Sequence, residues 1–510
     1  MRLKFTKTLV LFLTIYHSAS LTSQTFIGLQ QSNFGGIHQA GINPAFAATS
    51  RHRVYINGLT AGFGFSNDYV RLNLPFSYLN LITGNVPSQY KNAQGKLQFS
   101  DAWLSENNSE RPKNGNLYLQ TRGPGVLYNV GKGFAIGLQY KNTISFQIND
   151  VAYPLAKLAR YGIDSSNGTF TFSGPNKFQV GSTYGDNAFT VNMNAYGEIG
   201  LTLAKTVVKN DELTLSVGAT PKLLLGFGTG YIKNNGMLIK AQGADTIIFG
   251  NTDLEYGYTD ISQLTDINAI NFNAIGSQLN GRGVGYDLGV AFEFNPSGTK
   301  KVTNGKTGYL FKGGISLLDA GNIRYNQNLK NTRISNTSGE KMFVITPEFA
   351  DAWSDGETRG LAYTDSIMRT IFNVDTSAQE VISKLPTTLN LQFDYNIFKF
   401  LYVGANLSQD LRGKKTIGSR RASYLMLIPR IETKIFEVSI PIGLMNDYTA
   451  GRIGFYLRVG PVFVGSDNII GQLRSNNIYG ADLYFGISTG ITRNKNSGSN
   501  SSGSGENAGS

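Results

Sequence analysis

The stretch LPTTLNLQFDYNIFKFLYVGANLSQD, residues 385–410, decides the fold class. From Thr388 to Tyr395 polar and apolar residues alternate without exception, and a similar alternation runs from Leu401 to Ser408. A period of two is typical of a β-strand whose two faces meet different surroundings. Only a few residues separate the two runs, which is enough to turn the chain. The stretch therefore predicts an antiparallel hairpin with one apolar face and one polar face.

Comparable alternation recurs along most of the chain. The clearest further strands and hairpins cover residues 126–142, 197–223, 284–294, 436–443 and 479–491. Most runs are longer than the roughly 5–6 residues usual in soluble proteins and reach the roughly 9–11 that a membrane strand needs. The sequence predicts an all-β fold, a transmembrane antiparallel up-and-down β-barrel of about 14 strands, within a range of about 12–16. A large secreted β-protein is the alternative, because a soluble sandwich also has one apolar face on each sheet.

Composition favours the membrane barrel. The chain has 60 Gly, 31 Phe and 26 Tyr but only 16% charged residues, against about 25% in soluble domains. Cysteine is absent, which excludes disulfides and thiolate metal sites. The formal net charge is +12, yet the basic residues are scattered and form no stripe, so we expect no nucleic acid partner. We interpret the basic surplus as rim and loop charge that faces the phosphates of outer-membrane lipid and lipopolysaccharide.

The first 23 residues predict a secretory signal peptide. Three basic residues precede an apolar run over residues 9–16, and small polar residues follow it. The run is shorter than the roughly 20 residues that cross a bilayer as a helix. We expect cleavage after Ser23, with Ser20 as the other candidate. The expected location is the cell outer membrane of a Gram-negative bacterium, after Sec-type export.

The remaining chain divides into three parts. Residues 24–50 lack a strand pattern and are a candidate luminal plug, residues 51–491 form the barrel, and residues 492–510 are a flexible tail rich in Gly, Ser and Asn. Four long loops are expected on the outer side of the membrane, at residues 85–116, 150–184, 241–281 and 326–384. Within them, residues 156–161 and 377–384 have helix-like sequences.

Two sets of residues resemble known outer-membrane proteins. Gly480, Leu483 and Phe485 are similar to the signal in the last strand by which the barrel assembly machinery recognises its substrates, so this machinery is an expected partner during biogenesis.

The segments that carry the wider resemblance are NPAFAA (43–48), AYGEIGLTLAKTV (195–207), GRGVGYDLGVAFEFNP (281–296), GGISLLDAGNIRY (313–325), LPTTLNLQFDYN (385–396) and RVGPVFVGSDN (458–468). Together they resemble an uncharacterised family of Bacteroidota outer-membrane barrels with a domain of unknown function. This resemblance implies a barrel in the outer membrane and no known activity.

A more distant resemblance concerns the candidate plug. Asn43, Pro44 and Ala45 resemble the N-terminal segment of fatty-acid-transporter-like barrels. In those barrels the start of the chain can lie in the lumen, and the resemblance implies the same place here. These three residues are therefore the candidate plug residues.

Charged residues on the polar faces of the strands are the candidate functional residues. Those predicted to line the lumen are Glu198, Asp287, Glu293, Lys312, Arg458 and Asp482. They either line an aqueous path or pair with one another and close it.

An enzyme is not expected. His17 leaves with the signal peptide, and neither His38 nor His52 has an acid-base partner at an informative spacing. No EF-hand or phosphate-loop pattern is present, and we expect no catalytic site, no metal and no cofactor.

Two functions remain open. The first is a channel or transporter that moves small or hydrophobic solutes through the lumen past the plug. The second is a structural or partner-binding barrel that docks a surface or periplasmic protein through its loops or its tail.

Overall fold

The computed structural model describes residues 26–493 except for 78–79, 82–83, 162–182, 186, 243–245, 260–278, 297–307, 338, 345, 355–356, 375–378 and 471–478. The predicted signal peptide and the predicted tail from residue 494 onward therefore lie outside the described residues. In the described part of the chain, no helix is both long enough and apolar enough to cross a membrane.

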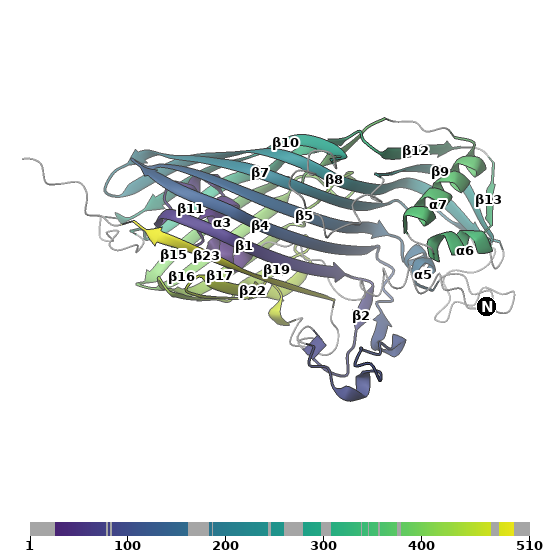
Figure 1. Ribbon diagram of the computed structural model, residues 1–510, viewed down its shortest axis with the longest axis horizontal. Coiled ribbons are helices and arrows are strands. Elements are labelled where there is room, and N and C mark those ends of the chain that lie inside the picture. The colour runs from purple at the N-terminus through teal and green to yellow at the C-terminus, as the bar shows by residue number, and fades with distance from the viewer. Residues whose placement is uncertain are drawn as a thin grey trace, which may run out of the picture.

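Fourteen antiparallel strands, all within the described residues, close into a barrel (Figure 1). In order around the wall they are β1 (His52–Asn67), β4 (Lys113–Gly131), β5 (Phe134–Val151), β7 (Phe189–Lys209), β8 (Leu213–Ala241), β10 (Gly281–Phe294), β11 (Phe311–Tyr325), β15 (Thr388–Phe398), β16 (Leu401–Asp410), β17 (Tyr424–Glu432), β18 with β19 (Phe436–Ser439 and Ile442–Met445), β20 with β21 (Ala450–Ile453 and Phe455–Val459), β22 (Val462–Ser466) and β23 (Gly480–Thr492). Strand β23 pairs with β1 from His52 opposite Thr492 to Ser66 opposite Gly480, which closes the ring. The predicted fold class and strand number are confirmed.

Polar side chains of the wall point inward and apolar side chains point outward, which is the reverse of the arrangement in a soluble protein. In β15 the polar residues Thr388 and Asn390 are buried, whereas Leu391 and Phe393 are 42% and 43% exposed. A soluble sheet buries its apolar face instead. The alternation in residues 385–410 therefore places polar side chains inside the barrel and apolar side chains outside it.

The two ends of the barrel differ in their connections. Tight turns such as residues 131–134 and 398–401 join the strands at one end, where β1 begins and β23 ends. The long connections are at the other end, and there β8 extends over 29 residues. Its extension pairs with β9 (Thr246–Thr259), which pairs with β12 (Leu329–Asn336) and β13 (Lys341–Val344). Short strands β6 (Thr183–Tyr184) and β14 (Val381–Lys384) add to β8 and β11.

Helices pack on the extension beyond the barrel (Figure 1). They are α5 (Tyr153–Tyr161), α6 (Pro347–Ser354) and α7 (Glu357–Phe372). Phe372 of α7 joins Ile239, Phe249 and Ile334 of the sheet in one apolar cluster. This cluster fixes the helices to the extended strands.

Several sequence expectations for the loops were wrong. The predicted loop 241–281 contains β9, and the predicted loop 326–384 contains β12, β13, α6 and α7. The segment 377–384 was predicted to be helix-like, but its part from 381 onward is strand β14, paired with residues 322–325 of β11. Pairing with a strand distant in sequence overrides the local preference there. The helix-like segment 156–161 lies in α5, as expected.

Residues 68–112 form an arm between β1 and β4. In it β2 (Val70–Leu72) pairs with β3 (Leu104–Glu106), and η2 (Ser88–Tyr90) and η3 (Asp101–Trp103) are single helical turns. Residues 113–116, expected in the loop 85–116, belong to β4.

Candidate functional site

Residues 26–50, the N-terminal segment, lie inside the barrel. The segment contains α2 (Ile27–Gln31), α3 (Ile37–Ala40) and η1 (Pro44–Ala47), and all its residues except Gly41 and Thr49 are buried. Its backbone N–H groups donate to wall carboxylates, from Ile27 to Asp467 at 3.2 Å and from Asn33 to Glu432 at 3.0 Å. The segment therefore fills the lumen and is bonded to several parts of the wall.

Asn43, Pro44 and Ala45 pack against β8, β10 and β11. The Asn43 side chain accepts from the Ala45 N–H at 3.0 Å and donates to the Val290 carbonyl at 3.0 Å. Pro44 is the first residue of η1, where the missing N–H costs nothing. A Cβ at Gly289 would lie 2.1 Å from Asn43 Oδ1, so only glycine leaves room for this contact.

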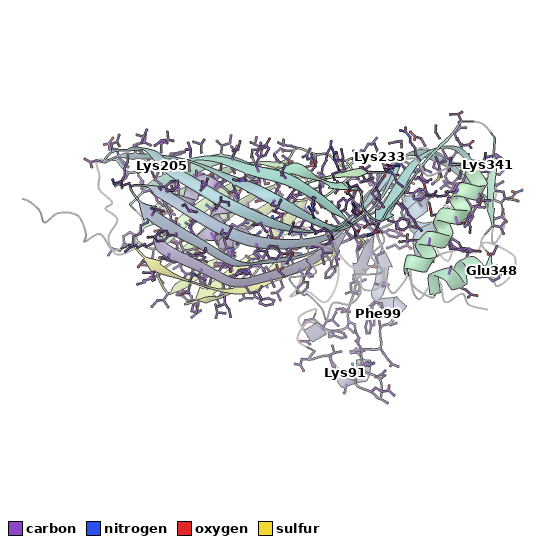
Figure 2. All side chains as sticks on the ribbon, turned by 45° about the horizontal axis from the view of Figure 1, so that its top comes forward. Lys91, Phe99, Lys205, Lys233, Lys341 and Glu348 are labelled. Atoms are coloured by element: carbon purple, nitrogen blue, oxygen red, sulfur yellow. The ribbon has the colours of Figure 1, made fainter. Side chains whose placement is uncertain are left out.

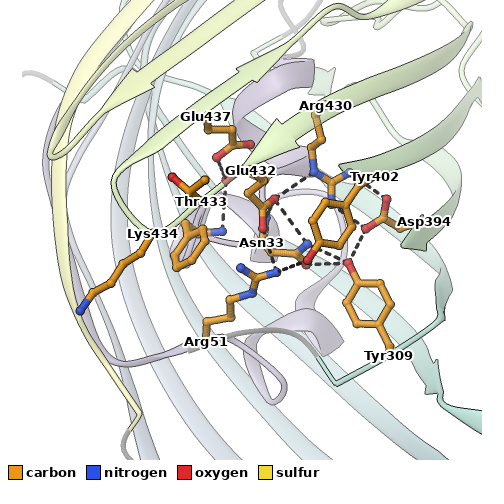
Figure 3. Close-up of polar contacts among 12 residues, drawn as sticks. Asn33, Arg51, Tyr309, Asp394, Tyr402, Arg430, Glu432, Thr433, Lys434 and Glu437 are labelled. Carbon is orange, nitrogen blue, oxygen red and sulfur yellow. Dashed lines mark hydrogen bonds and ion pairs between the residues drawn. The ribbon is translucent and has the colours of Figure 1, made fainter. Parts of the chain in front are cut away.

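An ion cluster around Arg430 ties the N-terminal segment to the wall (Figure 3). The fully buried Arg430 guanidinium lies 2.6 Å from Asp394 Oδ2 and 2.9 Å from Glu432 Oε2. Arg51, which follows the segment directly, lies 2.8 Å from Glu432 Oε1. The Tyr309 hydroxyl donates to Asp394 and also contacts Asn33. Two cations and two carboxylates neutralise each other here, as buried charges require.

A second ion cluster surrounds Lys222 on the strands from β5 to β11. Lys222 Nζ lies 2.7 Å from Asp287 Oδ1 and 3.6 Å from Glu198 Oε2, and it also contacts Asp319. Lys141 Nζ lies 2.7 Å from Glu198 Oε1. Five charged side chains, one from each of β5, β7, β8, β10 and β11, thus form one continuous network.

The connection between β16 and β17, residues 411–423, closes the lumen at the end with the long connections; we call it the lid. Gly418 N–H donates to Asn192 Oδ1 at 3.0 Å, and Arg420 N–H donates to Gln147 Oε1 at 2.8 Å. Asn192 and Gln147 belong to β7 and β5, which lie across the ring from β16 and β17. The lid therefore spans the width of the lumen.

The lid is strongly basic. It has no acidic residue and five basic ones, which are Arg412, Lys414, Lys415, Arg420 and Arg421. Arg421 Nη2 lies 2.9 Å from Asp319 Oδ2, which joins the lid to the Lys222 cluster. Burial alone would lower the pKa of Arg421, but attraction to Asp319, Tyr424, Tyr196 and Glu198 together outweighs burial, and the pKa lies above its ordinary value. The contact is therefore a charged pair.

A polar cavity of about 60 Å³ remains between the N-terminal segment and the lid; we call it the chamber. Gln30 and Ile37 of the segment line it on one side and Arg421 of the lid on another, and Lys222 and Asp319 are among the wall residues that line it. It has room for a few water molecules. The chamber is thus bounded not only by the wall but also by two parts of the chain that do not belong to the wall.

The structure separates the six predicted lumen residues into several groups. Glu198 and Asp287 both belong to the Lys222 cluster. Lys312 is buried 4.2 Å from the centre of the Phe46 ring and faces Glu293 on the neighbouring strand, which is half-buried.

The other two members lie elsewhere in the wall. Arg458 pairs with Glu437 at 3.2 Å, and Asp482 accepts from the Asp467 N–H at 2.7 Å. The six residues therefore do not line one common path.

Sequence reasoning missed the residues that complete the clusters, which are Arg51, Lys141, Lys222, Asp319, Asp394, Arg421, Arg430 and Glu432. Asp394 and Arg430 have the inward parity of their strands, so alternation alone could have identified them. The lid was missed because it is shorter than the four loops that stood out, although its run of basic residues was a signal. Within the described residues, no three His, Asp or Glu side chains gather in a way that could hold a metal ion.

The predicted assembly residues lie at the start of the last strand. Gly480 is buried, Leu483 is half-buried, and Phe485 points outward and is exposed. Recognition of these residues by the assembly machinery stays a prediction.

Comparison with known proteins gives one family. The model of a family of unknown function (DUF5723) matches residues 44–467. No curated protein matches the chain in sequence. Among solved structures, the toluene transporter TbuX of Ralstonia pickettii is 10% identical, with 92% of this chain and 98% of that chain covered and a TM-score of 0.36. The toluene transporter TodX of P. putida is 7% identical, with 90% and 95% covered and a TM-score of 0.37.

Proposed function

This chain belongs to the DUF5723 family, whose function is unknown, and on that premise we propose that it is an outer-membrane barrel that admits small polar solutes when the segments closing its lumen move. The observation that carries the proposal is the chamber, a charged cavity between two parts of the chain that do not belong to the wall.

The outer surface supports the membrane location. Apolar side chains at outward positions are exposed around the wall, as in Leu59, Val290, Leu427 and Ile487. Monomeric soluble proteins seldom expose apolar patches larger than a few hundred Å², whereas a lipid-facing wall requires an apolar band. The long connections and the lid then lie on the outer side of the membrane, and the short turns on the periplasmic side.

The lining of the chamber favours polar solutes over apolar ones. An apolar solute in contact with Lys222, Glu198 and Asp319 would remove water from charged groups and offer no hydrogen bond in return. A polar solute replaces those bonds. From the sequence we expected small or hydrophobic solutes, and the chamber fits small solutes that are polar.

The lid provides the test of this function. Replacing Arg421 with glutamine removes its ion pair with Asp319 and loosens the lid. Because residues 26–50 also fill the lumen, the proteins are compared as barrels without these residues, and a small sugar should enter liposomes several-fold faster through the Arg421→Gln barrel than through the barrel that keeps Arg421. Lys415→Gln, in the same loop but with an exposed side chain, is the matched control and should leave the rate unchanged. Equal rates for all three proteins would contradict a solute path through the chamber.

A second candidate function is docking of a surface protein. Apolar side chains are exposed on the extension beyond the barrel wall, namely Met342 and Val344 of β13 and Leu361 of α7. These residues lie outside the apolar band of the barrel, so lipid does not cover them there. Affinity purification from detergent-solubilised membranes should then yield a stoichiometric partner that is lost from a Met342→Ser, Leu361→Ser variant, and a barrel without any partner would count against this function.

A further inference from the structure

The arm, residues 68–112, extends sideways from the barrel and not over its mouth. Figure 1 and Figure 2 both show it pointing away from the barrel axis near the end with the long connections, and Figure 2 places Lys91 and Phe99 in its outer part. In a barrel that spans a membrane, a segment in this position lies beside the wall at the level of the outer membrane surface.

The base of the arm packs on the outer face of the wall. Leu72, Leu74 and Phe76 of the arm are buried together with Ala481 of β23, and Phe65 of β1 packs against them. Phe65 and Ala481 are opposite each other in the strand pairing and share the outward parity of Phe485. Ala481 is only 1% exposed because the arm covers it.

The position of this contact along β1 matches the edge of the apolar band. Exposed or half-buried apolar residues at outward positions of β1 run from Val54 to Phe65. About twelve residues at about 3.3 Å each, tilted by about 40°, span about 30 Å, which is close to the thickness of the hydrocarbon core of a bilayer. The arm therefore begins where this band ends, at the depth of the lipid headgroups.

The outer part of the arm has the chemistry of a membrane interface. The Trp103 ring lies 5.7 Å from the Tyr90 ring and 5.3 Å from the Phe99 ring, and Phe99 is exposed. Aromatic side chains with a polar edge prefer the headgroup level. Between residues 84 and 103 the charged residues are Lys91, Lys96 and Asp101, and the excess of basic residues is complementary to lipid phosphates.

We propose that the arm is an interfacial anchor that lies on the outer leaflet, with Phe99 and Trp103 among the headgroups and Lys91 and Lys96 bound to the phosphates of anionic lipid. The proposal rests on the membrane location proposed above. It adds a lipid-binding surface outside the lumen. The anchor holds the part of the wall where β1 and β23 meet at a fixed depth in the membrane.

The two tryptophans of the chain allow a direct test. Trp103 lies in the arm and Trp353 in α6, so Trp353→Phe leaves Trp103 as the single reporter and Trp103→Phe leaves the control. Each protein is reconstituted in phosphatidylcholine vesicles, with or without phosphatidylglycerol, that contain lipids brominated near the headgroup. We expect bromine to quench Trp103 strongly and Trp353 weakly, and phosphatidylglycerol to increase the quenching of Trp103.

Further variants separate the outcomes. Lys91→Gln with Lys96→Gln should remove the effect of phosphatidylglycerol, whereas Lys341→Gln on the extension should not. A barrel that inserts, as shown by heat-modifiable migration, with Trp103 quenched no more than Trp353 would overturn the anchor alone. Trp103 emission that responds to added oligosaccharide and not to brominated lipid would overturn it in favour of a sugar site. Failure of the barrel to insert would instead contradict the proposed function.

Discussion

Replacing Arg430 with methionine is expected to destabilise the barrel by about 3–5 kcal/mol, the usual effect of removing one partner from a buried ion pair. The Arg430 side chain is fully buried between Asp394 and Glu432. Methionine fills much of the same space, so the loss of stability comes mainly from the lost charge and not from the lost volume. Two carboxylates then remain in the interior, with Arg51 beside Glu432 and Lys312 opposite Asp394 in the strand pairing.

The effect is measured as the temperature at which the compact, fast-migrating form on a gel is lost, and as the free energy of unfolding in urea. Arg333→Met is the matched control, because Arg333 and its partner Asp253 are 62% and 43% exposed. An exposed pair contributes at most about 1 kcal/mol. Equal losses of stability in the two variants would show that the Arg430 cluster does not hold the wall together.

Replacing Leu427 with lysine is expected to destabilise the barrel by about 2–4 kcal/mol, which is the cost of a basic residue on the lipid face near the middle of the membrane. Leu427 is 55% exposed and lies near the centre of β17. In a soluble protein the same exposed position would accept lysine at little cost. The substitution thus distinguishes lipid from water as the surroundings of the wall.

Leu361→Lys is the control for the lipid face. Leu361 is 39% exposed on α7, beyond the barrel wall, and a surface substitution there should change stability by less than about 0.5 kcal/mol. Both variants are unfolded by urea from the same lipid vesicles. An equally small effect of the two substitutions would mean that the apolar exterior of β17 does not face lipid.

Alternation was enough to predict the wall because each strand of a barrel repeats the same local rule. Residues 388–395 and 401–408 became β15 and β16 with their polar residues inside, in register from Thr388 opposite Asp410 to Asn396 opposite Tyr402. The same rule failed for β9, whose residues belong to the extension of β8 and not to a wall crossing. A strand of that kind has no fixed inner and outer face, so its polar and apolar residues alternate only weakly.

The interior could not be predicted to the same extent, because its contacts join residues far apart in the chain. The lid residue Gly418 meets Asn192, and the pairing of Arg430 with Asp394 depends on the register of three strands. Parity indicated that these side chains point inward but not which charges meet. The Asn43-Pro44-Ala45 segment had a recognisable sequence, yet the glycine at position 289 that makes room for it is visible only in three dimensions.

An engineered disulfide can hold the N-terminal segment in place inside the barrel. A Cβ at position 404 would lie 3.0 Å from Gln31 Cγ. Because Cγ is one bond of about 1.5 Å from Cβ, the two Cβ atoms would be at most about 4.5 Å apart, which a disulfide can join. Because the chain has no cysteine of its own, Gln31→Cys with Gly404→Cys gives a single defined cross-link. This variant provides a form in which the segment cannot leave the lumen.

The most direct test of the central claim, that the N-terminal segment closes a solute path, is the rate at which a small sugar enters liposomes carrying a barrel without residues 26–50. We expect entry at least about tenfold faster than through the intact protein, because a wall of this size approaches the 16–18 strands that leave an aqueous channel when nothing fills them. The oxidised cross-linked form should be no faster than the intact protein and should recover its rate on reduction. A shortened barrel that still shows heat-modifiable migration but admits the sugar no faster than the intact protein would contradict the claim.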